Sequence, residues 1–331
     1  MGRFASSPVK PPFGYKVKAS PSPYPIVPIE YQKTNYRFSQ YKYIMTIISC
    51  RLMGGLGNQL FQIFTTISIA ISTKKIFLFP YSELLNVGIT RPTYWNNFLK
   101  KLINNTTYQN AVNDNKIIYS LPLISERKFT YDDLLLITVN LEKNPICLNG
   151  YFQTYKYFEK NYETIIELIG LRTIQETIRE NTKNPYKNAV SLHFRLGDYV
   201  SKQDCHPVMS IKYYTNAIQK IIEKTGSDTF SIIYFGEKAD SGPISISIQV
   251  LEKKFPNISF ISADLEEDWK QMLLMSVCEH NIIANSSFSW WGAYFNQNPN
   301  KIVCYPVTWF GPKLDYNETH DLCPPDWIRI V

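Results

Sequence analysis

The first regular pattern along the chain is a short apolar run, a glycine-rich loop and a long stretch with helical periodicity. The apolar run covers 46–50, the glycines lie at 54, 55 and 57, and the helical stretch covers 58–75. A second apolar run follows at 76–79. Two short apolar runs that flank a helix predict a strand–helix–strand unit with parallel strands.

The region that follows gives weaker signals. Residues 80–144 mix helix-like and loop-like segments and have no strong period. Beyond them, 146–151 is typical of a strand, and 155–169 is typical of a helix with acids and lysines on one face. The segment 181–184 stands directly before Pro185, and its composition predicts a junction between two domains.

The second half alternates strands and helices more clearly. Apolar runs that predict strands occupy 189–194, 230–235, 258–261, 281–284 and 301–305, and helical periodicity covers 211–224, 244–254, 265–278 and 289–296. This alternation favours a parallel, doubly wound sheet. We therefore predict an α/β protein with two such domains, 45–184 and 185–331, whose sheets face a cleft.

Composition separates the first 44 residues from this body. They hold seven of the 20 prolines, seven of the 35 Lys and Arg residues, and one of the 28 Asp and Glu residues. Of the net charge of +7, this leader accounts for +6. Because proline favours extended, solvated backbone, we expect 1–44 to be a disordered leader. A second interpretation is that the protein begins at Met45.

The nearly neutral body excludes several classes of protein. A protein that binds duplex nucleic acid normally carries a basic domain, and the body contains none. No apolar run suits a secretory signal or a transmembrane helix, so we expect no membrane span and a cytoplasmic location. The six cysteines lie far apart and lack the spacing of a zinc site, so we expect neither a metal centre nor disulfides.

Three motifs carry candidate chemistry, and the first is the loop at 54–62, which reads Gly-Gly-Leu-Gly-Asn-Gln-Leu-Phe-Gln. Residues such as Gly55 and Gly57 allow backbone to approach a ligand, and a helix start offers free N–H groups to an anion. Asn58 and Gln59 would place amide groups next to a sugar hydroxyl. The alternative is a tight strand–helix turn with Asn58 as the cap. The motif lacks the third glycine of a dinucleotide fingerprint.

The second motif, His-Phe-Arg-Leu-Gly-Asp-Tyr at 193–199, ends a predicted strand. Alternation places His193 and Arg195 on one face of that strand, and ligands of open α/β sheets bind at the carboxyl ends of the strands. The Arg195 guanidinium is suited to bind a diphosphate through paired hydrogen bonds. The alternative is a structural ion pair between Arg195 and Asp198, with His193 packed in the core.

The third motif, Asn-Ser-Ser-Phe-Ser-Trp-Trp-Gly at 285–292, follows an apolar strand. Its first residues offer hydroxyl and N–H donors at a helix start, where phosphate or sugar oxygens bind. Its two tryptophans either stack on a sugar or fill the core. The chain has no Asp-x-Asp triplet, phosphate-binding P-loop, nucleophile elbow or His-Glu-x-x-His motif. A departing diphosphate would therefore be stabilised by protein donors rather than by Mg²⁺ or Mn²⁺.

Together these motifs resemble glycosyltransferase family 11, the α-1,2-fucosyltransferases. Similar blocks occur in the family's order at 45–48, 54–62, 150–158, 193–199, 274–278 and 281–293. The resemblance implies a GT-B-like fold with an acceptor-side first domain and a second domain that binds GDP-L-fucose. It also implies an inverting transfer of fucose to the 2-hydroxyl of a galactose-type acceptor, with no metal and no other cofactor.

The resemblance also assigns site residues. Arg195 matches the family's donor-phosphate arginine, and His193 is similar to its histidine near the nucleotide. The other residues that we expect to bind the donor are Gly55, Gly57, Asn58, Gln59, Asn285, Ser286, Ser287 and Phe288. We expect the acceptor or the transferred sugar to contact Gln153, Tyr199 and Trp290.

The chain departs from the family pattern at two places. The family motif often reads His-x-Arg-Arg-Gly-Asp, and here Leu196 replaces the second arginine. Many members carry an acid one turn before the segment 274–278, where this chain has Gln271, with Asp268 a turn earlier. Asp268 and Gln271 are our candidates for reading guanine, and they leave the choice of nucleotide open.

The reaction should pass through a state similar to an oxocarbenium ion, with negative charge growing on GDP. Arg195 and the helix start at 286–287 would stabilise that charge. Asp198 is a catalytic candidate because it is the acid nearest to a motif, although a structural role suits it better. Two other functions stay open: a transferase of the same fold with another nucleotide sugar, and a non-catalytic module that binds sugar or nucleotide.

Overall fold

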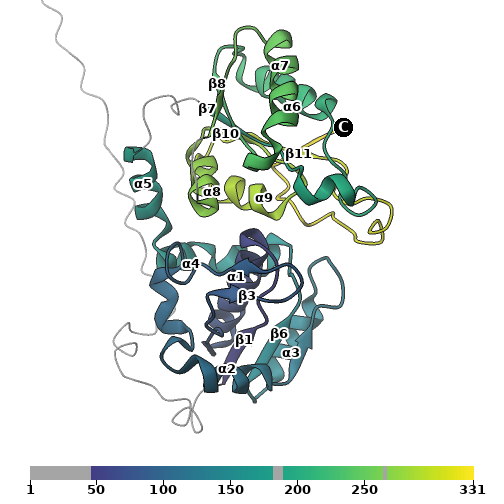
Figure 1. Cartoon of the computed structure of the whole chain (residues 1–331). Coiled ribbons are helices and arrows are strands. Elements are labelled where there is room, and N and C mark those ends of the chain that lie inside the picture. The colour runs from purple at the N-terminus through teal and green to yellow at the C-terminus, as the bar shows by residue number, and fades with distance from the viewer. Residues whose placement is uncertain (1–45, 182–188, 264–266) are drawn as a thin grey trace, which may run out of the picture.

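The computed structural model describes residues 46–181, 189–263 and 267–331. Two sheets of parallel strands form its frame, one from the first half of these residues and one from the second (Figure 1). The predicted leader, and the predicted junction beyond residue 181, lie outside the described residues. Within the described ranges, no helix has the length and apolar character needed to cross a membrane.

The first sheet has the strand order β2-β1-β6-β5, and all its pairs are parallel. Its strands are β1 (Ile47–Cys50), β2 (Ile76–Phe77), β5 (Leu123–Ser125) and β6 (Ile146–Asn149). The helix α1 (Leu56–Thr73) connects β1 to β2, which confirms the predicted strand–helix–strand unit. The helix ends where Lys74 adopts a left-handed backbone with φ of 56°.

The region 80–144 contains elements that the sequence pattern did not resolve. An antiparallel hairpin pairs β3 (Leu84–Leu85) with β4 (Arg91–Pro92). Two helices of nine residues each follow, α2 (Ala111–Tyr119) and α3 (Asp133–Leu141). Elements this short contain too few apolar repeats for periodicity to reveal them.

The predicted helix over 155–169 is wrong in its first half. Two short 3₁₀ turns, Tyr155–Tyr157 and Glu159–Asn161, come before α4 (Tyr162–Ile169). The Asn161 amide donates to the carbonyl and hydroxyl oxygens of Ser68 in α1 at 3.1 and 3.0 Å. These bonds hold the chain against α1 before the regular helix begins. A left-handed glycine at 170 then separates α4 from α5 (Leu171–Asn181).

The second sheet has the order β12-β11-β10-β7-β8-β9 and is parallel throughout. Its strands are β7 (Ala189–His193), β8 (Ser231–Phe235), β9 (Ser259–Ser262), β10 (His280–Ile282), β11 (Val303–Pro306) and β12 (Ile328–Ile330). The helices between them are α6 (Ile211–Thr225), α7 (Ser241–Lys254), α8 (Asp268–Val277) and α9 (Ser287–Tyr294). The expected GT-B-like α/β architecture with parallel sheets is confirmed, whereas the domain boundaries stay a prediction.

The two sheets share a hydrophobic core. The helix α9 lies on α1, and α8 lies on α5 (Figure 1). In this core the ring of Phe61 lies 4.5 Å from Trp290, and the ring of Phe64 lies 4.6 Å from Trp291, measured between centroids. All four side chains are fully buried. This aromatic packing fixes α9 against α1 and so positions the loops that precede them.

Candidate active site

The three sequence motifs meet where the strands of both sheets end. His193 closes β7, and Arg195 follows it. The segment 285–288 comes after β10, which pairs with β7. From the first sheet, the loop 54–57 follows β1 and approaches the backbone of 287–288. Ligands of open parallel sheets bind at this carboxyl edge, so the structure gathers the motifs where a site is expected.

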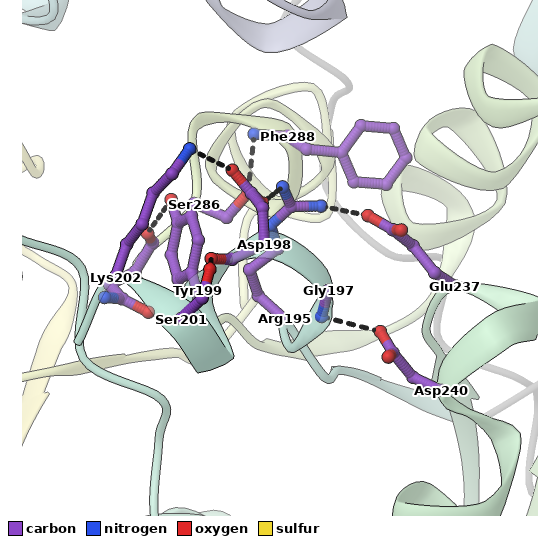
Figure 2. A network of polar contacts seen from close by, with 11 residues as sticks. Arg195, Gly197, Asp198, Tyr199, Ser201, Lys202, Glu237, Asp240, Ser286 and Phe288 are labelled. Carbon is purple, nitrogen blue, oxygen red and sulfur yellow. Dashed lines mark hydrogen bonds and ion pairs between the residues drawn. The ribbon is translucent and has the colours of Figure 1, made fainter.

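Arg195 is held by two carboxylates and an aromatic ring (Figure 2). Its Nη2 lies 2.5 Å from Oδ1 of Asp198, and its Nη1 donates to Oε1 of Glu237. The guanidinium carbon lies 4.8 Å from the centre of the Tyr199 ring. These contacts fix the guanidinium while 20% of the side chain stays exposed. A fixed and accessible guanidinium is suited to bind a phosphate group.

Asp198 joins Arg195 to a second cation. The Nζ of Lys202 lies 3.4 Å from the other oxygen of the Asp198 carboxylate. Burial opposes ionisation, but the charges of Arg195 and Lys202 hold the pKa of Asp198 below its usual value. A carboxylate with a lowered pKa is a weak base. The geometry therefore favours the ion-pair interpretation of Asp198 over a role in proton transfer.

Two acids that follow β8 complete this cluster, and the sequence reasoning missed both. Glu237 holds Arg195, and Oδ2 of Asp240 accepts the backbone N–H of Gly197 at 2.8 Å (Figure 2). Gly197 has φ of +45°, and a Cβ there would lie 3.2 Å from each carboxylate oxygen of Glu237. Because β8 pairs with β7, polar residues directly after β8 were the signal that could have identified them.

His193 is buried at the end of β7. Burial, and then the charge of Arg195, lower the pKa of His193 to about 3, so its imidazole is neutral at pH 7. Its ring centre lies 5.5 Å from that of Phe288. The Nδ1 atom has no hydrogen-bond partner among the described residues. His193 is thus packed, as one interpretation held, and its contact with the nucleotide stays a prediction.

The first turn of α9 presents hydroxyl groups. Ser286 is the N-cap, and its Oγ accepts the N–H of Phe288 at 3.3 Å. The Oγ of Ser287 donates to Oδ1 of Asn58 at 2.7 Å. Both hydroxyls therefore already have protein partners, and the backbone N–H groups of this turn are the further donors for an anion.

Asn285 and Tyr199 shape the loop before α9. The Nδ2 of Asn285 donates to the carbonyl oxygens of Pro207 and Trp309 at 3.0 and 3.1 Å. The Asn285 side chain is buried, and its Oδ1 has no partner within the described part of the chain. The Tyr199 hydroxyl donates to the Asn285 carbonyl at 3.2 Å. Tyr199 thus connects the turn that carries Arg195 to the start of α9.

The N-termini of α1 and α9 meet in the middle of the site. A Cβ on Gly57 would lie only 2.4 Å from the carbonyl carbon of Ser287, so this glycine allows the close approach of two backbones rather than of a ligand. Gly55, which precedes the helix, has open space around its Cβ position. The N-cap is Gly55 and not Asn58, which corrects one alternative. Asn58 instead accepts hydrogen bonds from Ser287 and from Nε2 of Gln153.

Two expected ligand contacts are wrong because the side chains belong to the core. Gln59 is 1% exposed, and its Nε2 donates to the carbonyl oxygens of Gly54 at 3.0 Å and Pro92 at 2.8 Å. Trp290 is fully buried, and its Nε1 donates to the Leu322 carbonyl at 3.0 Å. Gln59 therefore holds the glycine loop in place, and Trp290 fills the space between the sheets.

The two candidates for reading guanine lie on α8. Asp268 is its first residue, and its carboxylate accepts hydrogen bonds from the Tyr94 hydroxyl and from the N–H of Trp269. Gln271 is half-buried one turn further on. Asp268 thus connects α8 to the first half of the chain, and reading guanine stays a prediction for both residues.

A third acid that the sequence reasoning missed supports the loop after β6. The two oxygens of the Glu126 carboxylate accept the N–H groups of Tyr151 at 2.8 Å and Phe152 at 2.9 Å. Phe152 has a left-handed backbone with φ of 54°. Burial outweighs these hydrogen bonds and raises the pKa of Glu126 to about 7. Glu126 therefore fixes the turn that places Gln153 beside Asn58.

Two proteins of Escherichia coli are similar in sequence to this chain. The chain is 26% identical over 304 residues to an α-1,2-colitosyltransferase of Escherichia coli, covering 86% of this chain and 99% of the relative. It is 31% identical over 203 residues to the O-antigen biosynthesis glycosyltransferase WbnK of Escherichia coli, covering 57% of this chain and 62% of the relative.

The chain also matches a solved structure and a family model. A crystal structure of POFUT1 in complex with GDP has a TM-score of 0.45 and 11% identity, covering 79% of this chain and 98% of that chain. The family model described as glycosyl transferase family 11 matches residues 39–330, which is most of the chain. The chain therefore belongs to glycosyl transferase family 11.

Proposed function

We propose that this glycosyltransferase moves L-fucose from GDP-L-fucose to the 2-hydroxyl of a galactose-type acceptor, in α-1,2 linkage and without a metal ion. The placement of Arg195 carries the proposal, because this guanidinium is fixed and partly exposed beside the start of α9 (Figure 2). A guanidinium and the free N–H groups of a helix N-terminus are donors suited to a diphosphate leaving group.

Leaving-group stabilisation is the main contribution that we assign to the protein. When the bond between the sugar and GDP breaks, positive charge develops on the sugar ring and negative charge on the diphosphate. Arg195 and the first turn of α9 would stabilise that negative charge as it grows. Because Asp198 and Tyr199 already orient Arg195, the guanidinium loses little freedom when the donor binds. We assign Asp198 to this positioning role.

The acceptor would enter from the side of the first sheet. The loops after β1 and β6 meet there, where Nε2 of Gln153 donates to Oδ1 of Asn58 at 2.9 Å. An acceptor hydroxyl that attacks from the face opposite the diphosphate inverts the anomeric centre. Gln153 and Tyr199 stay our candidates for contact with the sugars. Trp290 cannot make such a contact because it is fully buried.

A second candidate keeps the reaction and changes the sugar. The relative that matches over 99% of its own length is an α-1,2-colitosyltransferase, which favours a donor that carries colitose. Gln271 stands where many members of the family have an acid, so the choice of nucleotide in the donor also has to be tested. Both donors present a diphosphate to Arg195, so the two candidates share the proposed leaving-group chemistry.

The test is a GDP-release assay with GDP-L-fucose and GDP-colitose, each offered to lactose, lacto-N-biose and rhamnose-terminated sugars. The proposal predicts release of GDP with one of these donors, an α-1,2 linkage by NMR, and unchanged turnover in excess EDTA. A clear preference for UDP- or ADP-sugars would overturn it. Binding of GDP without release from any donor would instead indicate a non-catalytic module.

A further inference from the structure

The segment that carries Arg195 has one guanidinium where the family motif often has two. Leu196 stands at the second position, and it packs against the apolar core of the second sheet. A diphosphate that leaves with growing negative charge gains from every further cation placed beside it. A second guanidinium at the site therefore has to come from another segment of the chain.

Arg91 lies in β4, and its neighbours fix it at the edge where the two halves of the chain meet. Its backbone pairs with Leu85 of β3 in the antiparallel hairpin. The next residue, Pro92, accepts a hydrogen bond from Gln59, and Gln59 also bonds to Gly54 in the glycine loop. The hairpin strand that carries Arg91 is therefore tied to the loop that begins α1.

A second contact joins the residues just after β4 to the other half of the chain. The Tyr94 hydroxyl, three residues after Arg91, donates to the Asp268 carboxylate at the start of α8. On the side of the glycine loop that Gln59 holds, the backbone of Gly57 lies against that of Ser287. Arg91 thus stands between a contact to α8 and the junction of α1 with α9.

The charge of Arg91 reaches the Arg195 cluster. Burial opposes ionisation of Asp198, and Arg91 is nevertheless one of the cations whose charge lowers the pKa of this carboxyl. Arg91 forms no ion pair with any residue of the ranges 46–181, 189–263 and 267–331. By contrast, Arg195 is held by Asp198 and Glu237. Within those ranges, the Arg91 guanidinium is therefore a cation near the site without a carboxylate partner.

We propose that Arg91 is the second guanidinium that binds the diphosphate of the nucleotide sugar, together with Arg195. This inference rests on the proposed function. The role that the family motif gives to an arginine beside Arg195 then belongs to the β3–β4 hairpin in the first half of the chain. The diphosphate then binds two cations, one from each half of the chain. Donor binding therefore also strengthens the contact between the two halves.

The experiment measures GDP and guanosine affinity by calorimetry for the wild type, Arg91→Ala, Arg91→Lys and the exposed control Arg329→Ala. We expect Arg91→Ala to weaken GDP binding by about 10- to 100-fold, because a charge-assisted hydrogen bond is lost. Guanosine affinity should stay the same, Arg91→Lys should restore part of the GDP affinity, and Arg329→Ala should behave as the wild type.

The outcomes separate this inference from the proposed function. Unchanged GDP affinity in Arg91→Ala, or equal losses for GDP and guanosine, overturns the role of Arg91 even if Arg195→Ala abolishes GDP binding. Absence of GDP binding in the wild type overturns the proposed function and this inference with it. Circular dichroism and thermal melting verify the fold. If Arg91→Ala is unfolded, Arg91→Lys takes its place: a GDP affinity below that of the wild type supports the role of Arg91, and an equal affinity overturns it.

Discussion

Gly57 and Ser287 bring the two halves of the chain into backbone contact. A Cβ on Gly57 would lie 2.4 Å from the carbonyl carbon of Ser287 and 2.6 Å from the backbone nitrogen of Phe288. Since α1 and α9 both begin here, the positive ends of two helix dipoles lie close together. This close approach supports an anion site built from both halves.

Gly57→Ala should therefore destabilise the fold. The new methyl group has to displace the backbone of α9, a change of the kind that costs about 1–3 kcal/mol in a packed interior. Urea unfolding monitored by tryptophan fluorescence measures the loss. Gly242→Ala is the matched control, because the Cβ position of Gly242 near the start of α7 has nothing within 4 Å. Equal stability of the two variants would contradict the close contact.

Arg195→Ala should abolish transfer while the protein stays folded. The loss of one preorganised donor to a developing negative charge typically lowers kcat by about 100- to 1000-fold. Arg195→Lys should recover little, because an ammonium cannot reproduce the paired geometry that Asp198 and Glu237 fix. Steady-state GDP release measures kcat and KM, and thermal melting checks the fold. Near-normal turnover in Arg195→Ala would remove this residue from the mechanism.

The sequence predicted the second sheet better than the first. Strands of five residues such as β7 and β8 can be recognised from runs of apolar residues along the chain. The end of the first of these runs places Arg195 at the carboxyl edge of the sheet. The hairpin of β3 and β4 is formed by strands of two residues each, which no period can reveal. The sequence pattern therefore gives no indication that Arg91 lies on a strand beside the glycine loop.

In the candidate site too, some residues could be predicted from local sequence patterns and others depend on tertiary contacts. His193, Arg195 and Ser286 could be predicted because they lie at, or just after, the ends of predicted strands. Glu237 holds Arg195 only because β8 pairs with β7, and strand order cannot be obtained from one sequence. Trp290 belongs to the core because α9 packs on α1, which is a tertiary contact between residues far apart in the chain. Local patterns indicate which groups end a strand, and pairing decides which of them meet.

His193 should make the folded state sensitive to acid. Burial lowers the pKa of His193 to about 3 from the ordinary value of 6.5, so the unfolded chain binds more protons between these values. The contribution of His193 to the free energy of unfolding should therefore fall as pH drops from 6.5 toward 3, with a slope that approaches about 1.4 kcal/mol per pH unit. The difference in unfolding free energy between the wild type and His193→Phe, measured by urea unfolding at pH 7.5, 6.5, 5.5 and 4.5, should therefore change with this slope. The exposed control His320→Asn should keep the pH dependence of the wild type. A difference between the wild type and His193→Phe that does not change with pH would refute the assignment.

Glu126 should act on stability in the opposite direction. Burial raises its pKa to about 7 from 4.5, so the folded state binds more protons between these values. The contribution of Glu126 is thus greatest below pH 4.5 and is lost as pH rises through 7, by up to about 3 kcal/mol. Because His193 and Glu126 oppose each other between pH 4.5 and 6.5, the total slope of the wild type reveals neither.

The difference in unfolding free energy between the wild type and Glu126→Gln isolates this effect. The variant does not titrate, so its stability relative to the wild type should improve steadily from pH 4.5 to pH 7. A constant penalty of about 1–3 kcal/mol should also appear at every pH, because the amide can accept only one of the two N–H groups of Tyr151 and Phe152. Glu252→Gln on the exposed face of α7 is the control. A difference that does not change with pH would show that Glu126 is ionised throughout and acts through its hydrogen bonds alone.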